Sequence, residues 1–249
     1  MALTDKLKAI ADAIRSKTGS TESMTLDQMA SEISNISTGG SVEEPYIKEV
    51  YIPGTHSLKS VEFFGYTFVR EHAFYSCDLL TLESLPSEIT YIGRRAFYGC
   101  SKLALTNLPS GITDIGTQAF SDCANLNLTS LPVGLTKISD YAFSGCKSLS
   151  LTALPSGITV IGNNAFSSCR KLALTSLPSG ITAIGSMAFW DCGSLTSLTF
   201  DGTPNSIRSN SFQGCTNLTT INVPWAEGAV ANAPWGATNA TINYNYTGE

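Results

Sequence analysis

The sequence predicts a repeat solenoid made mostly of short extended segments in 23-residue coils, preceded by a short N-terminal helical segment. Two series of residues point to this fold. All seven cysteines are 23 residues apart, and seven phenylalanines, each three positions before a cysteine, repeat with the same spacing. They are Cys77, Cys100, Cys123, Cys146, Cys169, Cys192 and Cys215, with Phe74, Phe97, Phe120, Phe143, Phe166, Phe189 and Phe212. A fixed period of this length is typical of stacked coils, none of which can bury its apolar face alone.

Composition supports a packed core and argues against two classes of partner. Hydrophobic residues make up 43% of the 249-residue chain, and charged residues only 14%. The net charge of −5, without any basic cluster, gives no footprint for nucleic acid or an anionic membrane. No apolar run is long enough to span a membrane.

The N-terminal residues lack the uninterrupted apolar stretch of a secretory signal peptide. Three explanations fit this observation. The protein stays inside the cell, it leaves by another route such as in a virion, or its leader lies outside this sequence.

The cysteines are expected to be buried free thiols that act as small hydrophobes. One cysteine per coil in the same phase places them in a column, with neighbours roughly 4.8 Å apart if adjacent coils pair as strands. Parallel side-chain directions give poor disulfide geometry. No CxxC motif with histidine is present to indicate a metal site, so we expect neither a metal nor a cofactor.

Residues 1–38 predict a hairpin of two short amphipathic helices. Their apolar residues follow helical spacing, at Leu7, Ile10, Ala11 and Ile14 and again at Leu26, Met29, Ala30, Ile33 and Ile36. About 38 residues bury too little apolar surface to be stable alone, so the hairpin must dock elsewhere. Docking between subunits, which would make a homo-oligomer, is the favoured interpretation, and an intramolecular cap is the alternative. Residues 39–45 form a flexible linker.

Residues 46–224 are expected to form the solenoid. From 46 to 72 the repeat is degraded, as a terminal coil should be, although Val69 is in phase with Ile92. Within the regular part, we expect each proline to end a ladder strand, because proline has no N–H. The phenylalanines should form a continuous inward stack.

Glycine occupies one further phase of the repeat, which indicates a turn. These glycines are Gly93, Gly116, Gly162 and Gly185. Ser139 holds the same phase, so glycine is preferred there and is not strictly required.

The recurring pattern Leu-Pro-Ser-Gly-Ile-Thr-x-Ile-Gly-x-x-Ala-Phe-x-x-Cys resembles the BspA-type, or Treponema-type, leucine-rich repeat over most of the chain. The resemblance implies a curved right-handed solenoid with a parallel sheet along one face and little helix. Members of that family are mostly bacterial surface or secreted proteins implicated in adhesion to host or matrix proteins. The resemblance therefore favours an extracellular, cell-surface or virion location.

Five coils depart from the family spacing after the cysteine. Leucine comes one residue early, at Leu82, Leu105, Leu128, Leu151 and Leu174, and the expected inward position holds Glu83, Thr106, Thr129, Thr152 or Thr175. Because strand side chains alternate between faces, two arrangements are open. Either a bend turns the leucines inward and the threonines outward, which is favoured, or the threonines are buried and the leucines line the surface. The second arrangement would create an exposed apolar stripe typical of a binding surface.

Residues 225–249 break the period and are expected to form a C-terminal cap, in which residues 240–246 alternate as a last strand should. Together with the N-terminal segment, this end also resembles prophage tail and minor structural proteins of Gram-positive gut bacteria. That second resemblance would explain a surface-type repeat without a leader.

Candidate partner-binding residues are of two kinds. Trp190, Trp225 and Trp235 are candidate anchors, although filling the open end of the core is the alternative for the last two. The hydroxyls of Thr106, Thr129, Thr152 and Thr175 are candidate contacts, and a solvated sheet face without a binding role is their alternative.

Catalysis has little support in the sequence. There is no GxSxG nucleophile elbow and no Walker loop, and the cysteines stand in contexts too apolar to activate a thiol. We therefore predict a non-catalytic recognition or adhesion module for a protein or glycan partner, as part of a phage tail or cell-surface structure. The alternatives are a purely structural spacer and an enzyme with a site in the irregular 46–72 coil.

Overall fold

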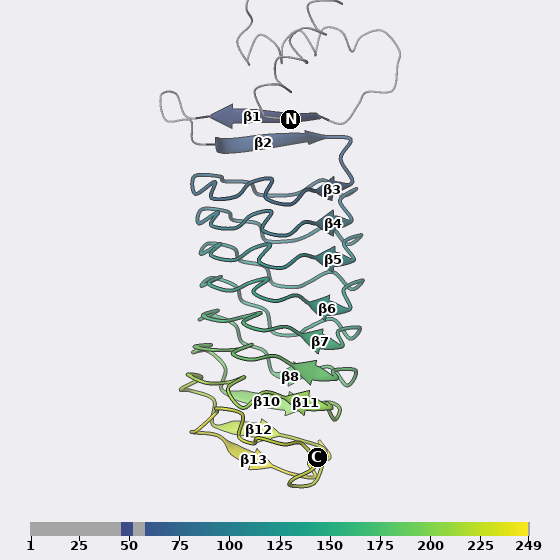
Figure 1. The fold of residues 1–249 in the computed structure, drawn as a ribbon, viewed down its shortest axis with the longest axis vertical. Helices are drawn as coiled ribbons and strands as arrows, with labels where there is room; N and C mark the ends of the chain where they lie inside the picture. Colours follow the sequence, from purple (N-terminus) through teal and green to yellow (C-terminus); the bar gives the residue numbers. More distant parts are fainter. Residues whose placement is uncertain (1–45, 52–57, 249) are drawn as a thin grey trace, which may run out of the picture.

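A computed structural model describes residues 46–51 and 58–248, which form an elongated stack of coils (Figure 1). The expected helical hairpin at 1–38 and the linker at 39–45 lie outside the described residues. Within 46–51 and 58–248 every regular element is a strand. None of the described residues belongs to a helix that could cross a membrane.

The first two strands form an antiparallel pair at the N-terminal end of the stack (Figure 1). Strand β1 (Tyr46–Tyr51) pairs with β2 (Leu58–Phe64), with Tyr46 opposite Phe64. This segment was expected to be a degraded coil, and from β3 onward it is one, because Val69 pairs with Ile92. The part before β3 differs because only residues 52–57 separate β1 from β2, and a parallel crossover needs a dozen residues or more.

Parallel strands repeat along one side of the stack at 23-residue steps, for example Tyr91 opposite Asp114. They are β3 (Phe68–Val69), β4 (Tyr91–Ile92), β5 (Asp114–Ile115), β6 (Lys137–Ile138), β7 (Val160–Ile161), β9 (Ala183–Ile184) and β11 (Ser206–Ile207). In each strand the second residue, an isoleucine or valine, is buried and the first is exposed or half-buried. Strands of two residues are long enough to form a sheet here, because each strand pairs with the equivalent strand of the next coil.

On another arm of the coil, a further parallel sheet forms only in the last coils. Its strands are β8 (Ser176–Leu177), β10 (Ser197–Phe200), β12 (Thr220–Asn222) and β13 (Thr241–Asn243). The order is β13-β12-β10-β8, and β13 confirms the expected last strand. Proline follows β8 directly at Pro178, as expected of a residue without an N–H. The same prediction is wrong for Pro86, Pro109, Pro132 and Pro155, because no strand of this arm precedes them.

The early leucines explain why this further sheet begins late. Leu105, Leu128, Leu151 and Leu174 are at most 1% exposed, Leu82 packs against the core, and the adjoining threonines are exposed. The bend that turns leucines inward is therefore confirmed, and the alternative of an exposed leucine stripe is wrong. In these coils the bend breaks strict alternation, whereas Leu198 and Phe200 of β10 are both buried at strand spacing.

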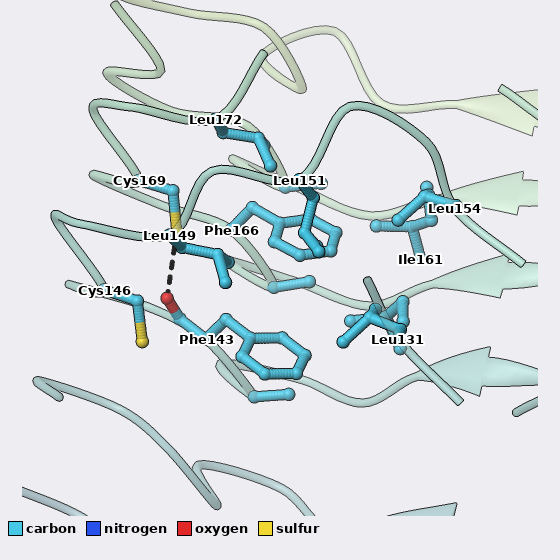
Figure 2. Close-up of a cluster of buried hydrophobic side chains, with 14 of the residues drawn as sticks. Leu131, Phe143, Cys146, Leu149, Leu151, Leu154, Ile161, Phe166, Cys169 and Leu172 are labelled. Atoms are coloured by element: carbon cyan, nitrogen blue, oxygen red, sulfur yellow. Dashed lines mark hydrogen bonds between the residues drawn. The ribbon is translucent and has the colours of Figure 1, made fainter. Parts of the chain in front are cut away.

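The seven repeated phenylalanines stack through the centre of the solenoid, as expected, and Figure 2 shows two of them, Phe143 and Phe166. Adjacent ring centroids are 5.1–5.6 Å apart, and the ring planes lie within 19° of parallel. Each ring packs on its equivalent in the next coil because the period puts identical side chains at identical positions.

The repeated cysteines are free thiols, and all but the half-buried Cys77 are buried. Each of the other six points its sulfur at the carbonyl of a phenylalanine 26 residues earlier, as Cys169 does toward Phe143 at 3.0 Å (Figure 2). The Sγ–O distances in this column are 3.0–3.1 Å. The thiols therefore do more than fill space, because each donates a second hydrogen bond to a phenylalanine carbonyl that already accepts a backbone N–H, as the Phe143 carbonyl does from Cys146.

Backbone hydrogen bonds tie each coil to both neighbours. On the strand side the Gly116 N–H donates to the carbonyl of Ile92 in the preceding coil, at 2.8 Å. On the opposite arm the Phe97 N–H donates to the carbonyl of Ala119 in the following coil, also at 2.8 Å. That arm contains a left-handed residue such as Arg95 or Gln118 in most coils, with φ of 54° and 60°. The exposed side chains of this arm, residues 70–76 and their equivalents, are called the turn face below.

The repeated glycines serve close approach between coils. A Cβ added to Gly116 would lie 2.6 Å from the backbone nitrogen of Arg94, and one added to Gly185 would lie 2.6 Å from that of Asn163. Their φ angles lie outside the left-handed region, so the conformational freedom of glycine is not what the position needs. Glycine was expected at this phase because of a turn, but the structure shows that it is needed because a larger residue would collide with the neighbouring coil.

Two tryptophans close the C-terminal end of the core. Trp235 is 0% and Trp225 6% exposed, and their ring centroids are 6.3 Å apart. Phe200 packs edge-on against Trp225 at 5.3 Å. Large aromatic side chains thus fill the end of the core beyond the last phenylalanine of the stack, in the final partial coil that carries β13.

Candidate binding surface

The sequence-predicted site residues do not form one cluster. Thr106, Thr129, Thr152 and Thr175 are exposed in one phase of the coil, and Trp190, 39% exposed, lies in another phase, on the turn face. The burial of Trp225 and Trp235 in the end of the core leaves their rings with little surface for a partner. Of the three tryptophans, only Trp190 presents a substantial exposed surface.

The column that contains Trp190 also holds two tyrosines that the sequence analysis did not single out. Each position in this column directly follows a core phenylalanine, and its residues are Tyr75, Tyr98, Ser121, Ser144, Ser167, Trp190 and Gln213. The aromatic members of the column reach the surface, with Tyr75 and Trp190 exposed and Tyr98 half-buried, whereas Ser121 and Ser167 in the same phase are buried. The 23-residue spacing of the two tyrosines was the available signal.

Tyr75 and Tyr98 stack on each other at the surface. Their ring centroids are 5.0 Å apart and their planes differ by 7°. Tyr75 is 46% exposed and Tyr98 is half-buried. The imidazole of His72 lies 5.7 Å from the Tyr75 ring. Stacking holds both rings in place before any partner arrives.

Arg95 extends this stack toward the third coil. Its guanidinium carbon lies 6.0 Å from the centroid of the Tyr98 ring, and its Nε donates a hydrogen bond of 2.6 Å to Oε1 of Gln118. A cation over an aromatic face is attracted by the negative charge of that face. We call His72, Tyr75, Tyr98, Arg95 and Gln118 the Tyr–Arg stripe.

Polar side chains further along the turn face are bound to one another. Asp140 Oδ1 accepts the backbone N–H of Asn163 at 2.7 Å, and Asn163 Oδ1 accepts that of Ser186 at 2.9 Å. Ser186 in turn donates to Asn210 Oδ1 at 3.1 Å. These groups form a ladder that joins successive coils, so their hydrogen-bonding capacity is largely used within the chain.

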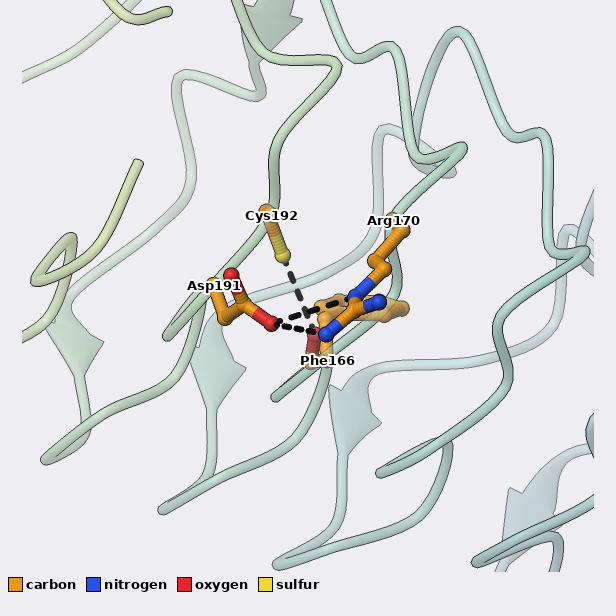
Figure 3. A network of polar contacts seen from close by, with 4 residues as sticks. All are labelled: Phe166, Arg170, Asp191 and Cys192. Carbon is orange, nitrogen blue, oxygen red and sulfur yellow. Dashed lines mark hydrogen bonds and ion pairs between the residues drawn. The ribbon is translucent and has the colours of Figure 1, made fainter. Parts of the chain in front are cut away.

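Two basic groups away from the Tyr–Arg stripe have carboxylate partners. Arg170 donates from Nε and Nη2 to Oδ2 of Asp191, both at 3.2 Å (Figure 3). Lys137 Nζ lies 3.6 Å from Oδ1 of Asp114. Both pairs are at the surface, where an ion pair contributes little to stability, but each neutralises its basic group.

Burial makes the cysteine column chemically quiet. Loss of hydration raises the pKa of the Cys100 and Cys215 thiols to about 12. The same cause, reinforced by neighbouring thiols, raises the pKa of Cys123, Cys146 and Cys169 well above the ordinary value. Only a thiolate is an effective nucleophile or metal ligand. Among the described residues no group of three histidine, cysteine or acidic side chains is placed to hold a metal ion.

The sequence and the structure were compared with known families and proteins. A family model described as BspA type leucine rich repeat region (6 copies) matches residues 29–150, 67–192 and 136–227. A leucine-rich repeat protein from Bacteroides ovatus is similar at 19% identity, over 83% of this chain and 76% of that chain, with a TM-score of 0.47. None of the curated proteins compared with the sequence is significantly similar to it.

Two further solved structures are similar. One is a leucine-rich repeat protein of T. pallidum, at 28% identity over 71% of this chain and 81% of that chain, with a TM-score of 0.41. The other is the pneumococcal vaccine antigen PcpA, at 20% identity over 63% of this chain and 42% of that chain, with a TM-score of 0.43. The matched ranges of the family model together cover most of the sequence, including every coil that carries the phenylalanine and cysteine columns. The chain therefore belongs to the BspA-type leucine-rich repeat family.

Proposed function

We propose that this chain is a non-catalytic recognition module that binds a protein or glycan partner through the Tyr–Arg stripe of its turn face. The observation that carries the proposal is the parallel stack of Tyr75 on Tyr98 at the surface, 5.0 Å apart. Tyrosine and arginine are enriched among the residues that dominate binding energy at interfaces. No other exposed region among residues 65–248 combines two stacked aromatic rings with a basic side chain.

Preorganisation supports this assignment. A side chain that is already fixed loses little conformational entropy on binding. Tyr75 and Tyr98 hold each other, and the Arg95 side chain is fixed by Tyr98 and Gln118. The stripe rests on a rigid core, because Phe74 and Phe97 directly precede the two tyrosines and are stacked 5.1 Å apart.

The setting that we propose is a phage tail or a cell-surface structure, with the partner on a host or another cell. The resemblance of the chain ends to prophage tail proteins and the surface location of most members of the repeat family support it. Residues 1–38 would then join subunits, in keeping with their two apolar stripes. The alternative function is an enzyme with a site in the 46–72 coil. That coil contains His56, which lies outside the described residues.

A structural spacer is the second candidate function. The unbroken phenylalanine stack from Phe74 to Phe212 and the self-contained polar ladder from Asp140 to Asn210 favour it. A spacer needs rigidity and no partner. The two functions differ in the Tyr–Arg stripe, because a spacer would not need ordered aromatic side chains at its surface.

Binding of the full-length chain to arrays of glycans and matrix proteins tests the proposal. We expect at least one array component to bind, and the double variant Tyr75→Ala/Tyr98→Ala to bind it at least about 10-fold more weakly. Tyr141→Ala is the matched control, because Tyr141 is an exposed aromatic residue of the same face outside the stripe. A chain that binds nothing on either array would favour the spacer.

A further inference from the structure

We propose that the Tyr–Arg stripe recognises an acidic peptide segment of a protein partner. This inference rests on the proposed function and specifies the partner's chemistry. The juxtaposition that carries it is Arg95, stacked on Tyr98 and held by the neutral amide of Gln118 instead of a carboxylate.

The charge of Arg95 is not neutralised within the described chain. Arg170 and Lys137 each lie within ion-pair distance of an aspartate. Glu71 and Asp122, the carboxylates in neighbouring columns, form no ion pair with Arg95 among residues 65–248. An amide acceptor at position 118 orients the guanidinium through Nε and leaves the positive charge, with the Nη donors, available to a carboxylate.

The tyrosines add to this preference for anions. Parallel stacking turns their ring edges and hydroxyls, and not their faces, toward a ligand that approaches from the side. An aromatic ring is positive at its edge and negative on its face. Neither phenol hydroxyl has a hydrogen-bond partner among residues 65–248. The stripe therefore presents hydroxyl donors, ring edges and a guanidinium, all of which attract a negative group.

At Tyr98 the same stacking disfavours a sugar. A pyranose typically packs its C–H groups against an open aromatic face. Tyr98 has one face covered by Tyr75, and Arg95 lies over its ring. A peptide carboxylate needs no open face, since it reaches the donors at the ring edges and on the guanidinium. Coils roughly 4.8 Å apart also spread the donors over two coils, which suits neighbouring acidic side chains on one extended peptide.

Selection from a phage-displayed library of random peptides tests the proposal. The full-length chain is the target, and Gln118→Glu is the counter-target. This variant keeps an acceptor for Nε and places a carboxylate beside Arg95, so it removes the free charge without removing the stack. The best peptides are then synthesised, and their affinities are measured by fluorescence anisotropy together with those of oligogalacturonate and a neutral oligosaccharide.

We expect the enriched peptides to be rich in aspartate and glutamate. Gln118→Glu and Arg95→Ala should each weaken them by at least about 10-fold, because both remove a charge-assisted contact. Arg170→Ala is the matched control and should change affinity by less than about 2-fold, since Arg170 is already paired with Asp191. Tyr98→Phe keeps the ring stack and should lose only the contribution of one hydroxyl.

Four outcomes would overturn the inference. The inference fails if the enriched peptides lack acidic residues. It also fails if wild type and Gln118→Glu bind the peptides equally. In both cases the chain is still a recognition module, but its binding site or the chemistry of its partner differs from that proposed. Tight binding of oligogalacturonate without any peptide would assign the stripe to an acidic sugar. If no peptide or sugar binds, and no component of the glycan and matrix-protein arrays binds, the proposed function is wrong as well.

Discussion

The hydroxyl of Ser139 donates a hydrogen bond of 2.6 Å to the carbonyl of Ile115. In the equivalent place, the backbone N–H of Gly116 donates to the carbonyl of Ile92 at 2.8 Å. The serine side chain occupies the space in which neighbouring coils approach each other, so its hydroxyl takes over the role of the amide. Among the described strands, β5 and β6 accordingly belong to different sheets.

A larger residue at this phase has a milder effect near the C-terminus. The N–H of Arg208 still donates to the carbonyl of Ile184, but at 3.2 Å compared with 2.8 Å for Gly185. A Cβ at this position therefore lengthens or displaces the ladder bond. The strand side is interrupted once, while the opposite arm remains bonded there, for example from Phe120 to Ala142 at 2.9 Å.

Replacement Ser139→Gly should join β5 to β6. The variant gains a backbone hydrogen bond of about 1 kcal/mol but loses the serine hydroxyl bond and about 0.5–1 kcal/mol of backbone entropy. We therefore expect slower amide hydrogen exchange at residues 136 and 139 and a change of under about 1 kcal/mol in unfolding free energy. Unchanged exchange at both amides would show that Ser139 is not the cause of the interruption.

Replacement Gly116→Ala should destabilise the solenoid by at least about 1–3 kcal/mol, as overpacking against rigid backbone does. The added Cβ would lie 2.6 Å from the Arg94 backbone nitrogen. Gly193→Ala is the matched control, because a Cβ there meets nothing within 4 Å. Urea unfolding followed by circular dichroism measures both variants. Equal stabilities of the two would contradict the steric account of this glycine phase.

Truncation Phe143→Ala should lower the free energy of unfolding by roughly 3–5 kcal/mol. Phe143 is fully buried between Phe120 and Phe166, with ring centroids 5.6 Å away on both sides. Val133→Ala is a suitable control, since Val133 is 83% exposed and should change stability by less than about 0.5 kcal/mol. A loss below about 1 kcal/mol at Phe143 would mean that the coils do not share one core.

Alkaline pH should destabilise the protein through its buried thiols. Burial raises the pKa of Cys146 well above 9.0 and that of Cys100 to about 12, so the folded state holds these protons more tightly than the unfolded state. The contribution is complete below about pH 9 and is lost as the pH rises toward 12. Each such thiol costs up to about 1.4 kcal/mol per pH unit in that window.

Denaturant unfolding under reducing conditions at pH 8 and pH 10 measures this effect. Cys146→Ala should reduce the pH dependence of the unfolding free energy by the contribution of one thiol. Leu149→Ala, which also truncates a fully buried side chain, should lower stability at both pH values without changing the slope. Parallel slopes for all three proteins would exclude the thiols as the cause.

Light scattering of the full-length chain and of a variant that starts at Ser41 tests the role of residues 1–38. If these residues join subunits, the full-length chain is an oligomer and the shortened one a monomer. Their paired apolar stripes would then be buried between copies. Two monomers would assign the segment to another role, such as an intramolecular cap.

By itself, the sequence determined which residues share a column. A strict 23-residue period places every Phe on a Phe and every Cys on a Cys in the next coil, whatever the path of the backbone. The phenylalanine stack and the column of free thiols were therefore predictable, and the alternation of residues 240–246 predicted the last strand. The same period also put Tyr98 beside Tyr75, although a pattern cannot say that their rings lie parallel.

Only the tertiary structure decided which column faces inward and how neighbouring coils touch. Leucine and threonine in adjacent positions fit either face, and the packing of Leu105 to Leu174 against the core selects the bend that buries leucine. The steric need for glycine, the interruption at Ser139 and the neutral support of Arg95 by Gln118 likewise arise between coils. The period states that coils repeat, whereas contact distances depend on three-dimensional packing, which spacing along the chain does not encode.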